Sequence, residues 1–158
     1  MLTVTRVAYF DSAHHLPNYD GKCSNVHGHT YRLEVSVGQE EGSVQQSGSQ
    51  QGMVVDFHDI DSILKTKVLD VLDHKDLNTV SGLDNPTAEN IVLWIKNAIE
   101  SDIVALSADP VVLLYSVRVW EGEKSYATWQ YFPPVCEEVR NALANSSYEP
   151  KKGDDYNI

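Results

Sequence analysis

Cysteine is scarce in this chain of 158 residues, which contains only Cys23 and Cys136. Two cysteines allow one disulfide, which is too few to indicate a disulfide-stabilised secreted domain. No apolar run approaches the ~20 residues that a membrane-spanning helix needs. The first residues are too polar to resemble a signal peptide. We therefore expect a cytoplasmic protein with reduced thiols.

Positive charge is scarce as well. Twelve lysines and arginines stand against 23 aspartates and glutamates, which gives a net charge of −11 at pH 7. This imbalance argues against general affinity for nucleic acid or for anionic membranes. An anionic substrate would need a local basic pocket. Hydrophobic residues make up 42% of the chain, which is ordinary for a globular protein with a real core.

The apolar pattern predicts strands and helices in a simple order. Alternating or β-branched runs predict strands over residues 2–10, 30–37, 111–120 and 126–132. Apolar residues spaced by three and four predict one helix over about residues 57–70 and a second that starts near Thr87. The order strand, strand, helix, helix, strand, strand predicts an α+β fold with one antiparallel sheet and helices on one face.

Three other segments complete the expected layout. Residues 38–52 contain four glycines, five glutamines and three serines, which predicts a flexible connection. Residues 53–55 are expected to resume the strand, and residues 135–144 to form a short terminal helix. We expect one domain over residues 1–132 and a C-terminal extension over residues 133–158.

Histidines are concentrated between residues 13 and 29. His27 and His29 are two residues apart at the start of a predicted strand, so their side chains point to the same face. His14 or His15 is available as a third ligand. Three histidines with an open position are typical of a catalytic zinc site. The alternative is that these histidines are ordinary turn and surface residues.

Cys23 lies close to this group and has two functional interpretations. It is either a fourth ligand that closes a structural zinc site, or a base or nucleophile beside a three-histidine metal site. Lys22 and a nearby cation would both lower the pKa of the thiol. The alternative to both is a small buried residue, which most free cysteines are.

Two acidic positions are further candidates. Asp73 precedes His74 after the first predicted helix, and a carboxylate beside an imidazole can form a proton-transfer pair. Taken alone, a solvated loop explains this dipeptide as well. Glu121 follows a long predicted strand, where a carboxylate could meet a ligand. Taken alone, an exposed turn glutamate is the simpler interpretation.

Six motifs resemble, in order, those of the 6-pyruvoyltetrahydropterin synthase and 6-carboxytetrahydropterin synthase family. They are Phe10-Asp-Ser-Ala-His14-His-Leu16, Cys23-x-x-x-His27-Gly-His29-x-Tyr31, Val55-Asp56-Phe57, Leu72-Asp73-His74-x-x-Leu77-Asn78, Asn85-Pro86-Thr87-x-Glu89-Asn90 and Val117-x-Val119-Trp120-Glu121. No single motif is decisive, but six in sequence are highly specific.

The resemblance implies the tunnelling fold, in which two helices cover one face of a four-stranded antiparallel sheet. It implies trimers, usually doubled to hexamers, with active sites at subunit interfaces. It also implies roles for seven residues. His14, His27 and His29 match the zinc ligands, Cys23 the catalytic cysteine, Asp73 and His74 a proton-transfer pair from a neighbouring subunit, and Glu121 the carboxylate that anchors the pterin ring.

The implied substrate is 7,8-dihydroneopterin triphosphate. The compact spacing from Cys23 to His29 resembles the bacterial branch, which forms 6-carboxy-5,6,7,8-tetrahydropterin and acetaldehyde and feeds queuosine and related deazapurine synthesis. The alternatives are the branch that forms 6-pyruvoyltetrahydropterin in a tetrahydrobiopterin-type pathway, and a non-enzymatic domain with a structural zinc site.

The chain departs from the family pattern at two positions. His15 stands where the family often has arginine, which leaves Lys22 and Arg32 as candidates for triphosphate contacts. Gly122 stands where threonine often follows the glutamate, which bears on the geometry of pterin binding.

Overall fold

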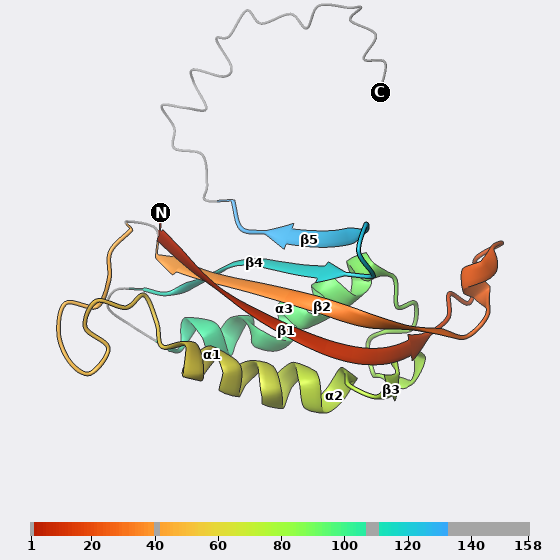
Figure 1. Ribbon diagram of the computed structural model, residues 1–158, viewed down its shortest axis with the longest axis horizontal. Coiled ribbons are helices and arrows are strands. Elements are labelled where there is room, and N and C mark those ends of the chain that lie inside the picture. The colour runs from red at the N-terminus through yellow and green to blue at the C-terminus, as the bar shows by residue number, and fades with distance from the viewer. Residues whose placement is uncertain (1, 40–41, 107–110, 133–158) are drawn as a thin grey trace, which may run out of the picture.

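A computed structural model describes residues 2–39, 42–106 and 111–132 of the chain. Helices cover one face of a curved five-stranded sheet in the order β3-β1-β2-β4-β5 (Figure 1). The strands are β1 (Leu2–His14), β2 (His27–Gln39), β3 (Lys75–Asp76), β4 (Leu113–Trp120) and β5 (Tyr126–Gln130). The helical elements are η1 (Lys22–Ser24), α1 (Phe57–Leu64), η2 (Lys65–Leu69), α2 (Asp70–Leu72), η3 (Leu77–Thr79) and α3 (Ala88–Val104).

The predicted α+β fold is confirmed, but the predicted strand count is wrong. The fifth strand, β3, has only two residues and pairs in parallel with Ser12 and Ala13 of β1. Both of its residues are exposed and charged, so the apolar pattern carries no signal for it. It forms because His74 adopts a left-handed backbone conformation (φ 57°) that turns the chain back along β1.

The two longest strands extend further than the apolar pattern predicts. β1 continues through residues 11–14, past the predicted strand 2–10, and β2 begins at His27, before the predicted strand 30–37. The two strands pair antiparallel over their whole length, from Leu2 opposite Gln39 to His14 opposite His27. Backbone hydrogen bonds between the two strands therefore extend both of them into polar segments that the apolar pattern does not mark.

The core lies between the sheet and the helices. Residues 31, 33, 35 and 37 of β2 alternate inward and are fully buried. The helix over residues 57–72 is continuous but contains a π-helical turn at η2, and it buries Ile60, Leu64 and Val68. Phe57 and Val71 fit the same three- and four-residue spacing but are exposed.

The remaining predicted elements had different outcomes. α3 begins after Thr87, whose side chain accepts a hydrogen bond from the Asn90 backbone N–H, as expected of an N-cap. Residues 53–55 form no strand, although Val54 and Val55 are buried. The predicted helix at 135–144 lies outside the described residues. Within the described residues, no helix is long and apolar enough to cross a membrane.

Candidate metal centre and active site

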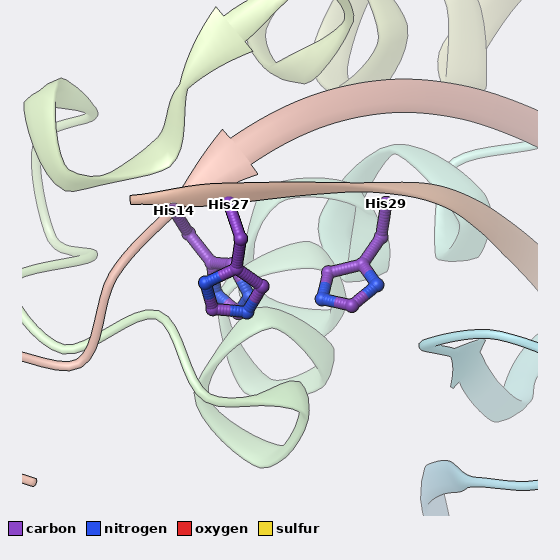
Figure 2. Close-up of side chains that lie close together, drawn as sticks. All are labelled: His14, His27 and His29. Carbon is purple, nitrogen blue, oxygen red and sulfur yellow. The ribbon is translucent and has the colours of Figure 1, made fainter. Parts of the chain in front are cut away.

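Three histidines extend the core-facing side of the sheet beyond its hydrophobic part. On β1 the inward positions run from Phe10 through Ser12 to His14, and on β2 they run back from Tyr31 through His29 to His27. The register sets His14 opposite His27. Figure 2 shows the three imidazoles on the same side of the two strands. The i, i+2 spacing of His27 and His29 thus has the predicted consequence.

The histidine group, defined as His14, His27 and His29, has the geometry of a metal site. One ring nitrogen from each residue lies within 4.8 Å of the other two. The ring centroids of His14 lie 4.5 Å from His27 and 5.2 Å from His29, and those of His27 and His29 are 4.9 Å apart. His15, the other sequence candidate, does not belong to the group.

Hydrogen bonds to the outer ring nitrogens orient two of these imidazoles. His14 Nδ1 lies 2.7 Å from the carbonyl oxygen of Pro86, and His27 Nδ1 lies 2.8 Å from that of Asn25. A carbonyl oxygen can only accept, so each Nδ1 carries the proton and each Nε2 keeps its lone pair. This is the arrangement in which histidine ligates a metal.

Two of the inward nitrogens also lack a hydrogen-bond partner. Nε2 of His14 and Nε2 of His29 are buried without a hydrogen-bond partner among the described residues. His14 is only 1% exposed. Buried polar atoms are almost always satisfied, so these atoms indicate a missing partner. Three neutral imidazoles suit zinc, and the residues present therefore fit the expected metal.

Glu121 faces the histidine group from the end of β4. Its Oε1 lies 3.2 Å from His14 Nε2 and 3.7 Å from His29 Nε2, close enough for an ion pair when the imidazole is protonated, although neither contact has hydrogen-bond geometry. These contacts lower the pKa of Glu121, with His14 as the main cause. The simpler interpretation of an exposed turn glutamate is wrong, because the side chain is only 28% exposed and contacts the site.

The histidines respond differently to their surroundings. Burial disfavours a charged His14, but contacts with Glu121 and the Pro86 carbonyl outweigh burial and raise its pKa. Burial lowers the pKa of His29. Protons and metal compete for the same Nε2 lone pair of His14, so metal binding would displace the proton that Glu121 favours.

Tyr31 closes the inner wall of the site. It is 0% exposed, and its ring lies 5.5 Å from that of His29 and 6.0 Å from that of His14. Burial and the carboxylate of Glu121 raise its pKa, so the phenol stays protonated. It stacks on Phe10, which joins the site to the hydrophobic core.

Cys23 lies in the short helical turn η1 and is separate from the histidine group. The turn is fixed by a 2.8 Å hydrogen bond from the Leu16 backbone N–H to the Cys23 carbonyl oxygen. The Asn25 backbone joins this turn to His27, since its N–H donates to the Lys22 carbonyl and its own carbonyl accepts from His27. Cys23 is a free thiol, and Cys136 lies outside the described residues.

Asp73 and His74 contact each other at the edge of the sheet. His74 Nδ1 lies 3.0 Å from Asp73 Oδ1, which also accepts the backbone N–H of Asp11 at 2.9 Å. The Asp11 hydrogen bond is the main reason that the pKa of Asp73 is lowered, and His74 adds to it. The His74 side chain is 76% exposed and does not belong to the histidine group of its own chain.

Comparison with known proteins identifies the family of this chain. Residues 3–131 match the family described as 6-pyruvoyl tetrahydropterin synthase. This chain belongs to that family. The membership confirms the prediction of an enzyme and the family resemblance.

Two relatives and one solved structure show how close the likeness is. The 6-carboxy-5,6,7,8-tetrahydropterin synthase of Haemophilus influenzae is 33% identical over 82% of this chain and 99% of its own. That of Synechocystis is 38% identical over 79% and 88%. The structure of 6-pyruvoyl tetrahydropterin synthase from Caenorhabditis elegans aligns with a TM-score of 0.66 at 27% identity, covering 83% and 96%.

Sequence reasoning missed the groups that orient the histidines. The carbonyl oxygens of Asn25 and Pro86 are backbone atoms, so side-chain chemistry gives no signal for them, although Pro86 lies in a family motif. Arg32, a candidate triphosphate contact, interacts with side chains of its own chain. Its guanidinium pairs with Glu34 and lies over the Trp120 ring.

Proposed function

We propose that the protein is a zinc-dependent lyase that converts 7,8-dihydroneopterin triphosphate to 6-carboxy-5,6,7,8-tetrahydropterin, with release of acetaldehyde and triphosphate. The observation that carries the proposal is the histidine group, with nitrogens within 4.8 Å of one another, facing Glu121. Two relatives named 6-carboxy-5,6,7,8-tetrahydropterin synthase support this branch. We place the product in queuosine and deazapurine biosynthesis and the protein in the cytoplasm.

In this proposal the histidine group would hold the metal through Nε2 of His14 and His27 and a ring nitrogen of His29. Zinc, when bound there, supplies Lewis acidity toward the hydroxyls of the substrate side chain. Glu121 is ionised and accepts hydrogen bonds from N–H groups of the pterin ring. An acceptor for two N–H groups has to be deprotonated, which a carboxylate is at neutral pH.

Protons move through two further groups of the chain. The Cys23 thiolate takes and returns protons between the substrate side chain and the pterin ring. The Asp73 carboxylate accepts from His74 Nδ1–H, which leaves His74 Nε2 as the proton-transfer atom. Because the His74 side chain is exposed, we propose that it serves the active site of a neighbouring subunit in a trimer or hexamer.

We also propose that the catalytic domain spans residues 1–132 and that residues 133–158 are an extension outside it. The end of the family match at residue 131 supports this division.

The activity is tested by incubating the zinc-loaded protein with 7,8-dihydroneopterin triphosphate. Formation of 6-carboxy-5,6,7,8-tetrahydropterin with one equivalent of acetaldehyde is expected. A pyruvoyl product without acetaldehyde would select the second candidate, 6-pyruvoyltetrahydropterin synthase, which the likeness to the Caenorhabditis elegans structure favours. If the zinc-loaded protein forms neither product, both candidate activities are contradicted.

Replacing Cys23 by alanine separates catalysis from a structural zinc site. Because Cys23 lies outside the histidine group, Cys23→Ala should keep one zinc per subunit and the wild-type stability. Turnover should fall by at least about a hundredfold, the lower range for a lost acid–base group. Metal analysis and steady-state kinetics check this. Loss of zinc or unfolding would instead favour the structural zinc site.

A further inference from the structure

A strip of hydrogen bonds ties the chain after α2 to the end of β1. The Ser12 hydroxyl donates to the carbonyl oxygen of Leu72 at 2.5 Å, inside the protein. The Asp11 backbone N–H donates to the Asp73 carboxylate at 2.9 Å, and its carbonyl accepts the His74 N–H at 2.6 Å. The two segments then run in parallel as β3 and β1. The strip holds the Asp73–His74 pair against β1.

Asn78 completes this strip with its side chain. The backbone N–H of His15 donates to Asn78 Oδ1 at 2.9 Å, and Asn78 Nδ2 donates to the carbonyl oxygen of His15 at 2.9 Å. His15 directly follows the last residue of β1. The amide therefore satisfies both backbone groups of His15, as a neighbouring strand would. Only a side chain with a donor and an acceptor can do this, which excludes aspartate as well as alanine.

The same strip holds a member of the histidine group. His14 lies between Ala13, which pairs with β3, and His15, which Asn78 holds on both backbone groups. The ring of His14 is fixed separately, through Nδ1, by the Pro86 carbonyl. Asn78 thus fixes the backbone from which His14 projects, while Pro86 fixes the direction of its ring.

We propose that Asn78 is a positioning residue that sets the place of His14 and of the Asp73–His74 pair at once. This inference rests on the proposed function for its catalytic part. The His74 side chain is exposed and does not belong to the histidine group of its own chain. The strip would therefore link the metal site of one subunit to the proton-transfer pair that this subunit contributes to the next.

The test compares Asn78→Ala and Asn78→Asp with Asn97→Ala, an exposed asparagine of α3, as the matched control. Zinc affinity is measured by competition with a chromophoric chelator, without substrate. Both Asn78 variants should bind zinc about tenfold more weakly, the effect typical of residues that orient metal ligands. Amide hydrogen exchange at His15 and His74 should become faster, and Asn97→Ala should match the wild type in both measurements.

Kinetics of zinc-saturated protein test the second half of the inference. The turnover number should fall while KM stays close to that of the wild type, because Asn78 positions the proton-transfer pair and does not touch the substrate. Asn78→Asp keeps the acceptor for the His15 N–H, so it provides the comparison if Asn78→Ala does not fold.

Two outcomes are decisive. Wild-type zinc affinity and turnover number in folded Asn78 variants would overturn the proposal and leave Asn78 a purely structural residue. Weaker zinc binding in a protein whose wild type does not turn over dihydroneopterin triphosphate would support the positioning of His14, and would contradict the proposed function instead.

Discussion

At the scale of single residues, the site depends on which nitrogen of each imidazole is left free. The carbonyl oxygens of Pro86 and Asn25 accept hydrogen bonds from Nδ1–H of His14 and His27, so in each neutral imidazole Nε2 keeps its lone pair. At the sheet edge, the Asp73 carboxylate likewise contacts Nδ1 of His74. The same arrangement, an acceptor bonded to Nδ1, would serve both the proposed metal binding and the proposed proton transfer.

The stability of the protein in acid tests the contacts of the Asp73 carboxylate. Its folded-state pKa is lowered, so the stabilisation is present above the ordinary value near ~3.9 and is lost as pH falls through the folded value. Asp73→Asn does not titrate. The difference in unfolding free energy between wild type and Asp73→Asn should be constant above about pH 5 and shrink below about pH 4.

Urea unfolding of metal-free protein between about pH 2.5 and 6 measures this difference. It should stay below about 1 kcal/mol, because the carboxylate is 40% exposed and solvent screens it. Asp84→Asn, an exposed aspartate in the loop before α3, is the control. A difference that does not change with pH would contradict the assignment.

At the scale of secondary-structure elements, the start of α3 lies beside a candidate metal ligand. The Thr87 side chain caps α3 by accepting the Asn90 N–H at 3.3 Å. The preceding residue, Pro86, supplies the carbonyl that holds His14. α3 is anchored in the core by Ile91, Ile95 and Ile99, which are fully buried. The segment that leads into this core helix therefore also orients a candidate metal ligand.

Variants of two helix caps distinguish an effect on stability from an effect on zinc binding. Asp56 caps α1 by accepting the His58 N–H at 2.9 Å. Thr87→Ala and Asp56→Ala should each lower the free energy of unfolding by about 1 kcal/mol. Only Thr87→Ala should also weaken zinc binding, because only Thr87 adjoins the Pro86 carbonyl. Urea unfolding and chelator competition measure the two effects, and equal zinc affinities in both variants would refute the coupling.

At the scale of the whole molecule, the fold distributes the candidate residues over two places. His14, His27, His29 and Glu121 gather on the helix-covered face, where β1 ends and β2 begins. The Asp73–His74 pair lies at the β1 edge with its imidazole exposed. At the other edge, β5 pairs only with β4 among the described strands. Open edges allow pairing between chains, which agrees with the proposed assembly.

Mixed assemblies test whether active sites are shared. Cys23→Ala and His74→Ala should each be inactive as pure proteins. In a symmetric assembly formed from equal amounts of both, about a quarter of the interface sites would combine an intact Cys23 with an intact His74 from the neighbour. Turnover should recover to about that fraction of wild type after co-refolding. No recovery would show that each site is built within one chain.

Much of this layout follows from the sequence. The alternation in β2 and the i, i+2 spacing of His27 and His29 fix which side chains share a face, because the period of a strand is set by backbone geometry. The three- and four-residue spacing in α3 fixes its buried side in the same way. The ordered motifs predicted the family, and the match over residues 3–131 confirmed it.

Only the tertiary structure decided how these pieces meet. Spacing left His14 and His15 as equal candidates, and long-range pairing of β1 with β2 brought His14 alone into the group. β3, the Pro86 carbonyl and the inward turn of Glu121 likewise depend on segments far apart in the chain. Local sequence encodes the direction of a side chain relative to its own backbone. The partner it meets is determined by packing and by backbone hydrogen bonds between distant segments.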